Sequence, residues 1–94
     1  MRVTIRSAAH IAKILKGRQI YSEIPEQSTL GDLLRVLTEA YGQEFYNAVC
    51  NEEGYPPDKV AILVNGSSAM AKGGIGLQLG DGDDVLILPA ISGG

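Results

Sequence analysis

The sequence has little of what disulfide, thiolate and triad chemistry require. Cys50 is the only cysteine, so the chain can form no intramolecular disulfide and no cluster of thiolate ligands around a metal. A single free thiol is typical of a reducing compartment, which predicts a cytoplasmic protein. His10 is the only histidine, and one histidine with one cysteine and scattered acids makes no catalytic triad. We therefore expect no catalytic residue, no metal site and no enzymatic activity of this chain alone.

Long hydrophobic runs are also missing. No stretch approaches the roughly 18 apolar residues of a membrane-spanning helix, and residues 1–20 lack the continuous apolar run of a secretory signal. This segment is basic and poor in acids, as a transit peptide would be; the alternative is a strand and a basic turn inside the fold. The formal net charge is −3, whereas nucleic-acid binding needs a basic footprint. We expect neither a membrane nor a nucleic acid as partner.

The charge is unevenly distributed along the chain. Five basic residues precede the first acid: Arg2, Arg6, Lys13, Lys16 and Arg18. After them, all 11 acidic residues face only the other three of the eight basic ones. Such asymmetry can mark an interaction surface.

What is present is the composition of one modest globular domain. The chain has 94 residues, of which 45% are hydrophobic and 20% charged. It is too apolar for a disordered chain. A domain of this size can bury one core but has little room for a deep active-site cleft. A carrier, a binding module or a subunit is therefore favoured over an enzyme.

The first half of the chain predicts two strands and a main helix. Alternating side chains predict a half-exposed strand at residues 1–6 and a second strand at residues 19–24. Between them, apolar residues at helical spacing predict a short helix or turn that ends at Gly17. The main helix begins after Ser28 or Thr29, either of whose hydroxyls can cap it. Its apolar stripe is Leu30, Leu33, Leu34, Leu37 and Tyr41.

The second half predicts two more strands. A further helical turn is expected at residues 45–49 and a polar loop at residues 51–59. The uninterrupted apolar run 60–64 predicts a strand covered on both faces. The glycine-rich stretch 67–80 is expected to be irregular, although Leu77 and Leu79 could anchor it. Residues 85–88 form the last strand. With the first and last strands side by side and the helix across one face, this order predicts an α+β fold with a mixed four- to five-stranded sheet, as in a β-grasp.

Two motifs suggest ligand sites only weakly. The glycines of residues 73–76 lack the spacing and the following helix of a dinucleotide loop. The acidic turn 81–84 resembles the start of a calcium loop, but Ser92 stands where a bidentate glutamate is needed. We therefore expect no cofactor bound by this chain.

The C-terminal segment is the most informative feature. Residues 89–92, Pro-Ala-Ile-Ser, form a narrow spacer before Gly93 and Gly94. Such an end can thread into the active-site channel of another protein, and without a Cβ the Gly94 carboxylate is open to attack. A carboxylate is a poor acyl donor until it is phosphorylated or adenylated. The tail is therefore interpreted as a substrate for another enzyme's ATP chemistry, the alternative being a frayed end without a role.

Four stretches of the chain form a specific combination. They are VTIR at residues 3–6, STLGDLL at residues 28–34, VAILVNG at residues 60–66 and LGDGDDVLILPAISGG at residues 79–94. Together they resemble the MoaD/ThiS sulfur-carrier proteins, which are ubiquitin-like β-grasp domains. The resemblance implies a β-grasp domain at residues 1–89 and a flexible Gly-Gly tail at residues 90–94.

The resemblance also implies a reaction. A ubiquitin-activating-type enzyme would use ATP to adenylate Gly94, and sulfur from a persulfide donor would replace AMP to leave a thiocarboxylate. Gly93, Ser92 and Ile91 would thread into the partner's active site. Leu88, Pro89 and Ile91 would bind partners, and an apolar patch on the exposed sheet face is expected to support them.

Several destinations for the sulfur stay open. A MoaD-like chain would be the small subunit of molybdopterin synthase, with the large subunit as partner and a pterin precursor as acceptor. The length and the LPAISGG ending favour this pathway or a cysteine pathway over thiamine; some members of the family supply tRNA. The same activated Gly94 would make the chain a ubiquitin-like protein modifier if it acylated a lysine. The remaining alternative is a β-grasp interaction module whose tail is never activated.

Overall fold

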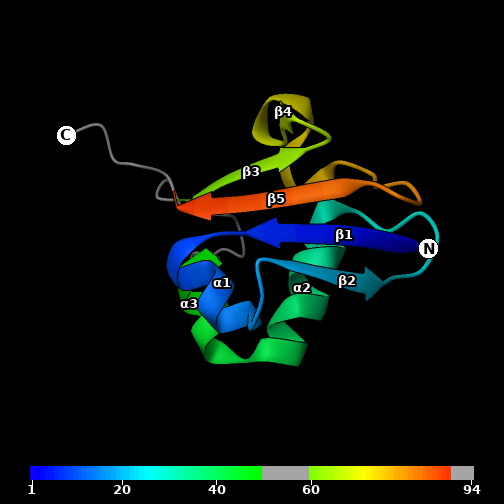
Figure 1. Cartoon of the computed structure of the whole chain (residues 1–94). Coiled ribbons are helices and arrows are strands. Elements are labelled where there is room, and N and C mark those ends of the chain that lie inside the picture. The colour runs from blue at the N-terminus through cyan, green and yellow to red at the C-terminus, as the bar shows by residue number, and fades with distance from the viewer. Residues whose placement is uncertain (50–59, 90–94) are drawn as a thin grey trace.

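The computed structural model describes residues 1–49 and 60–89, and this part of the chain forms a five-stranded sheet with helices across one face. The strands lie in the order β2-β1-β5-β3-β4 (Figure 1). Their bounds are β1 Arg2–Ser7, β2 Gln19–Glu23, β3 Val60–Val64, β4 Ser67–Ser68 and β5 Asp84–Pro89. The first and last strands are central neighbours and run parallel, whereas the other pairs are antiparallel. This confirms the predicted α+β fold with a mixed sheet.

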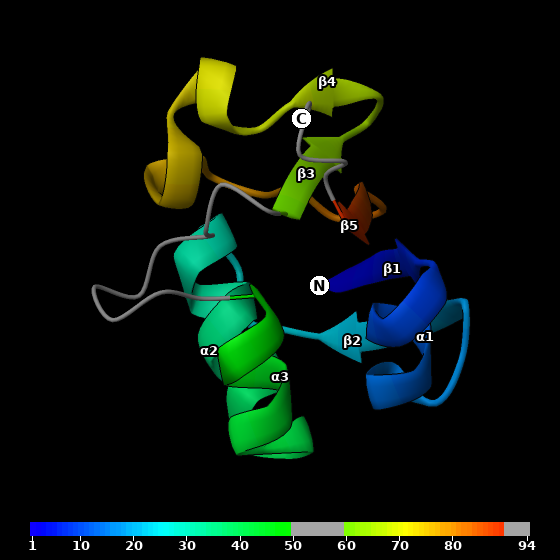
Figure 2. The same ribbon diagram turned by 90° about the vertical axis from the view of Figure 1, so that its left-hand side faces the viewer.

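The helices close one face and one end of the sheet (Figure 2). They are α1 (Ala9–Leu15), α2 (Leu30–Tyr41) and α3 (Gln43–Val49). α2 and α3 lie on the same side of the sheet, while α1 packs where β1 ends, in contact with β5 and α3. α1 therefore stands at the end of the sheet from which β5 leads into residues 90–94.

A capping box starts the main helix. The Thr29 side chain accepts a hydrogen bond of 3.2 Å from the Asp32 amide, and the Thr29 amide donates one of 2.9 Å to Asp32 Oδ2. These bonds from Thr29 hold the pKa of the Asp32 carboxyl below its ordinary value. Ser28, the other capping candidate, instead donates its hydroxyl to the Pro25 carbonyl. The sequence left the two residues open as caps, and the geometry assigns the role to Thr29.

Replacing Thr29 by alanine should lower the free energy of unfolding by about 1 kcal/mol, because the Asp32 amide loses its acceptor. Urea unfolding at neutral pH measures this loss. Thr38 on the same helix gives a matched control. Its hydroxyl donates to the Leu34 carbonyl within the helix, so Thr38→Ala should change stability by less than about 0.5 kcal/mol. Equal losses in both variants would argue against a capping role.

The core lies between the sheet and the helices. The predicted leucine stripe of α2 is buried, although Tyr41 at its end is only partly so. The prediction that residues 60–64 are covered on both faces was wrong. Val60, Ile62 and Val64 are buried, but Ala61 and Leu63 are only partly buried. The helices cover one face of this sheet, so every second side chain of β3 points to the other face.

The stretch 67–80 has only short elements of regular structure. It contains β4 and two short 3-10 turns, η1 (Met70–Lys72) and η2 (Gly74–Gly76). Its backbone is tied to the start of α2, because the Leu30 amide donates to the Leu77 carbonyl and the Leu79 amide donates to the Ser28 carbonyl. The segment therefore has little regular structure, and hydrogen bonds at Leu77 and Leu79 anchor it to the start of α2.

The element boundaries shift by one or two residues. β1 ends at Ser7 and β5 ends at Pro89, each one residue beyond its predicted end. β2 ends at Glu23, one residue before its predicted end, and Ile24 after it is buried in the core. The predicted turn at residues 45–49 is α3, which begins at Gln43. The polar loop predicted at residues 51–59 lies outside the described residues.

Candidate functional site

The end of β5 locates the site. Pro89 is the last described residue, and it pairs with Val60 at the end of the sheet next to α1. Of the residues predicted to bind partners, the structure therefore places Leu88 and Pro89. Ile91, Ser92, Gly93 and Gly94 lie outside the described residues, as does the predicted tail 90–94 as a whole. The assigned roles of all these residues remain predictions.

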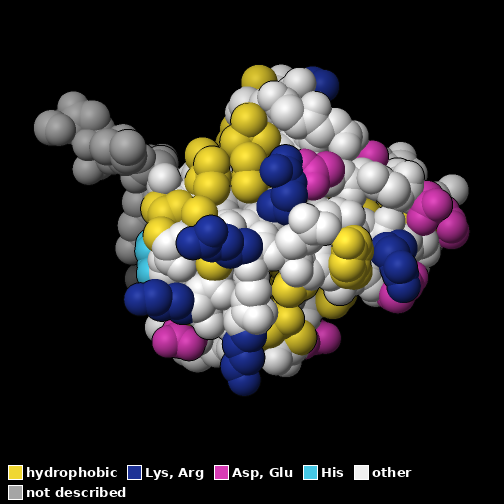
Figure 3. All heavy atoms as spheres, viewed as in Figure 1, with side chains coloured by type: hydrophobic (Ala, Val, Ile, Leu, Met, Phe, Trp, Pro, Cys, Tyr) yellow, Lys and Arg dark blue, Asp and Glu magenta, His cyan; other side chains and the backbone are white. Residues whose placement is uncertain are grey.

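An apolar patch lies on the face of the sheet opposite α2 and α3. We name it the outer patch; its residues are Ala61, Leu63, Leu86 and Leu88. The register pairs Ala61 with Leu88 and Leu63 with Leu86, so the four side chains are cross-strand neighbours. All four are partly exposed. Val85 and Ile87, which alternate with Leu86 and Leu88 along β5, are completely buried. Figure 3 shows apolar side chains gathered over β3 and β5.

An ion pair borders the outer patch on its β1 side. Arg6 Nε donates to Asp84 Oδ1 at 2.8 Å, and Arg6 Nη2 donates to Asp84 Oδ2 at 2.7 Å. This two-point contact lowers the pKa of the Asp84 carboxyl and raises the pKa of Arg6. Arg6 also pairs in register with Leu86 across the two parallel strands. The pair thus gives the outer patch a polar edge.

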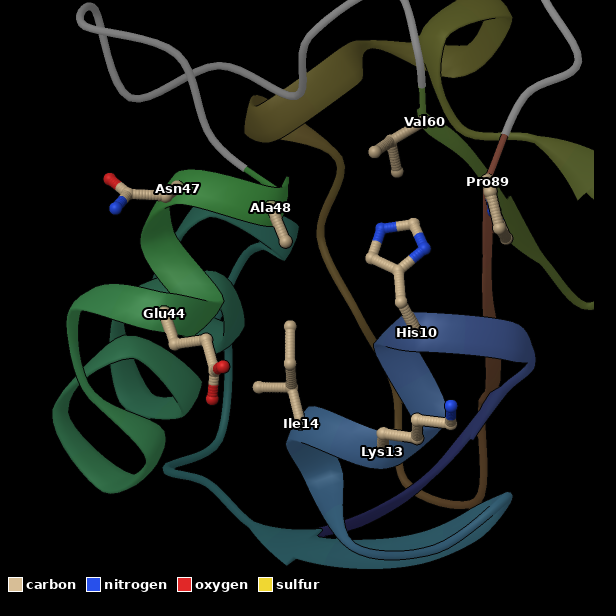
Figure 4. Close-up of a pocket in the computed structure, with 8 residues that line it drawn as sticks. All are labelled: His10, Lys13, Ile14, Glu44, Asn47, Ala48, Val60 and Pro89. Atoms are coloured by element: carbon tan, nitrogen blue, oxygen red, sulfur yellow. The ribbon is translucent and has the colours of Figure 1, made fainter.

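A cleft of about 700 Å³ opens at the point where β5 ends. α1 contributes His10, Lys13 and Ile14, α3 contributes Glu44, Asn47 and Ala48, and the strand ends contribute Val60 and Pro89. In Figure 4 the His10 ring projects from α1 toward Val60 and Pro89. The sequence predicted no catalytic role for His10 and did not indicate this cleft. Its walls come from four separate segments of the chain, and no local motif signals their meeting.

Features of a metal site or of a membrane-spanning helix are absent from the described part of the chain. Within 1–49 and 60–89, no group of three His, Cys, Asp or Glu side chains is placed to hold a metal ion. None of the helices in the same ranges combines the length and the hydropathy that crossing a bilayer requires. The features that stand out are therefore the outer patch, the cleft and the chain exit between them.

Comparisons with known proteins agree with this geometry. The family model described as "ThiS family" matches residues 9–94. The chain is 29% identical to small archaeal modifier protein 3 of Haloferax volcanii over the full length of both proteins. Among solved structures, CysO of Mycobacterium tuberculosis is 26% identical with a TM-score of 0.79, covering 95% of this chain and 99% of that one. A putative molybdopterin converting factor subunit 1 of Pyrococcus furiosus is 25% identical with a TM-score of 0.76, covering 97% and 99%.

The family match covers most of the chain, including the helices, the outer patch and the Gly-Gly end. The solved structures carry the same fold over nearly their whole length. The resemblance inferred from the sequence is thereby confirmed, together with the ubiquitin-like β-grasp fold. This chain belongs to the ThiS family of small ubiquitin-like sulfur carriers and modifiers.

Proposed function

We propose that this chain is a sulfur carrier whose Gly94 carboxylate is activated by a ubiquitin-activating-type enzyme. The observation that carries the proposal is the family match, which runs through the last strand to residue 94. The Gly94 carboxylate attacks the α-phosphorus of ATP, pyrophosphate leaves, and an acyl-adenylate forms. The terminal sulfur of a persulfide then attacks the acyl carbon and AMP leaves. A thiol finally attacks the donor-side sulfur of this acyl disulfide, forms a new disulfide with it, and leaves a thiocarboxylate on Gly94.

We propose that one part of the chain docks the partner and another part delivers the reacting group. The outer patch offers apolar surface that a partner can bury, and burial is worth about 25 cal/mol per Å². Beyond Pro89, five residues reach at most about 17 Å when extended. A partner's reacting centre must therefore lie within that distance of the strand end. On this account Leu88 and Pro89 belong to the docking surface, and Ile91, Ser92 and Gly93 occupy the channel.

The first destination that we propose for the sulfur is molybdopterin. The chain would act as the small subunit of molybdopterin synthase, without catalytic residues of its own, and would deliver sulfur inside the large subunit. Its similarity to a putative molybdopterin converting factor subunit 1 supports this assignment. ATP and the sulfur donor would be used by the activating enzyme rather than bound here. Both steps would take place in the cytoplasm.

Two other uses of the activated Gly94 also have support. The full-length similarity to a small archaeal modifier protein favours conjugation, in which a lysine amine attacks activated Gly94 in place of sulfur. The similarity to CysO likewise supports a sulfur carrier outside the molybdopterin pathway. All three routes begin with the same adenylation, so this first step is the one to test.

ATP–pyrophosphate exchange with the cognate adenylating enzyme tests the shared step. The full chain should support exchange of labelled pyrophosphate into ATP, because adenylation is reversible while the acyl-adenylate stays bound. The chain without Gly93 and Gly94 should support none. Exchange that is independent of these two residues would contradict activation at Gly94.

A further inference from the structure

Three cations at α1 have no carboxylate partner in the described chain. Lys13 lies in the last turn of α1, Lys16 follows it as the C-cap, and Arg18 comes two residues later. All three are exposed, and none forms an ion pair within residues 1–49 and 60–89. We name these three residues the basic face.

The other early basic residues behave differently. Arg2 Nε lies 2.9 Å from Glu23 Oε1, and Arg6 Nη2 lies 2.7 Å from Asp84 Oδ2. Their charges are thus matched by acids that come later in the chain. Among residues 1–49 and 60–89, folding therefore balances part of the charge asymmetry, and the early cations without an ion pair there are those at α1.

The basic face stands beside the exit of the chain. Lys13 lines the cleft that Pro89 also lines, and its side chain extends from α1 in Figure 4. Figure 3 shows Lys and Arg side chains spread over the α1 region, next to the apolar side chains of β3 and β5. A protein that receives the C-terminal residues would therefore meet the basic face together with the outer patch.

Folding alone does not explain the lysine at position 16. Its backbone has φ +60°, the left-handed region that costs a residue with a Cβ energy and that glycine adopts freely. The backbone amides of Lys16 and Gly17 both bond to carbonyls of α1, as in a helix end where glycine is usual. A glycine would fit this position better, so the lysine side chain stands where stability disfavours it.

We propose that the basic face binds an acidic protein surface that flanks the tail channel of the adenylating enzyme. This proposal rests on the proposed function, because it assigns the basic face to the same activation step. Unpaired cations attract carboxylates over a Debye length of about 8 Å at physiological salt, and they steer association. They would orient the carrier so that the strand end faces the channel.

A protein partner fits the charges better than a nucleic acid does. The chain is acidic overall, with a net charge of −3, and Glu44 lies across the cleft from Lys13. The phosphate backbone of a nucleic acid would be repelled by Glu44 and by the net negative charge of the chain. It would also need a longer row of basic residues than the three of the basic face. A protein surface can instead place its own carboxylates opposite the three cations only.

The test is the rate of pyrophosphate exchange at limiting carrier, measured from low to high salt. The triple variant Lys13→Glu, Lys16→Glu and Arg18→Glu should lower this second-order rate about tenfold at low salt. The loss should shrink as salt rises, and the rate at saturating carrier should stay unchanged. A matched control reverses three exposed cations elsewhere, with the same change in net charge: Arg2→Glu, Arg35→Glu and Lys72→Glu. The control should lose less than about twofold.

Lys16→Gly separates the side chain from the backbone. It should raise the Tm by roughly 4 °C, because strain at the helix end is relieved. The exchange rate at low salt should nevertheless fall. A higher Tm with an unchanged rate would overturn the assignment of Lys16 to the basic face.

The remaining outcomes are distinguishable. Equal rates in the wild type and both triple variants, or equal losses in both variants, would overturn the basic face alone. Binding of the wild type to transfer RNA that the basic-face variant loses, with unchanged exchange, would also overturn it. No exchange with the wild type would overturn the proposed function, and this proposal with it.

Discussion

Replacing Gly94 by alanine should lower the rate of adenylation about 100-fold, because a methyl group beside the reacting carboxylate displaces it in a channel built for glycine. The free energy of unfolding should change by less than about 0.5 kcal/mol. The buried core residues that the structure describes run from Val3 to Ile87, all before the terminal segment. Pyrophosphate exchange and urea unfolding measure the two effects on the same protein.

Gly76 provides the matched glycine. A Cβ added at this position meets nothing within 4 Å, and its backbone is not in the left-handed region. Gly76→Ala should therefore leave both the rate and the stability unchanged. If Gly94→Ala is adenylated as fast as the wild type, the C-terminal carboxylate is not the reacting group. A large loss of stability in Gly94→Ala would show that the residue acts in folding.

Replacing Leu88 by glutamate should weaken binding to the adenylating enzyme by about 10- to 100-fold. Losing the burial of one leucine costs about 1.5–3 kcal/mol, and each 1.4 kcal/mol is a factor of ten in Kd. Leu88 lies in the outer patch with its Cα paired to Ala61, and its neighbours Val60 and Ile87 hold the core without it. Titration calorimetry gives the change in Kd.

Tyr21 provides the control, because it lies on the same face of the sheet but outside the outer patch. It is 58% exposed on β2, and it pairs with Thr4 on the far side of β1 from the outer patch. Tyr21→Glu should change the Kd by less than about twofold, whereas Leu88→Glu should raise it by about 10- to 100-fold. Equal effects of the two variants would show that the partner binds elsewhere or reads the overall charge. A thermal scan of each variant confirms that the fold is retained.

Much of the fold followed from local patterns. The leucine spacing of α2 and the alternation of β1 depend on each element's own periodicity, and both were predicted correctly. Partial exposure of Ala61 and Leu63 was not predictable in the same way. A short, wholly apolar strand looks the same whether one face or both are covered, and coverage depends on where the helices pack.

The candidate site likewise has parts that local sequence patterns indicate and parts that they do not. Leu88 and Pro89 were predicted to bind partners because their motif is continuous in sequence. The structure places both at the end of β5, and their role stays a prediction. The cleft and the basic face could not be found in that way. They depend on α1 meeting α3 and on which early cations meet an acid after folding, and both are long-range contacts. The charge asymmetry was the available signal, and it pointed to a surface without locating it.

The most direct measurement is the intact mass of the chain after incubation with its adenylating enzyme, ATP and a persulfide donor. The account predicts a mass gain equal to the exchange of one oxygen for sulfur, located at Gly94 by fragmentation and absent when ATP is omitted. An unchanged mass, under conditions in which the same enzyme supports pyrophosphate exchange with this chain, would contradict a sulfur carrier and leave conjugation as the use of the activated end.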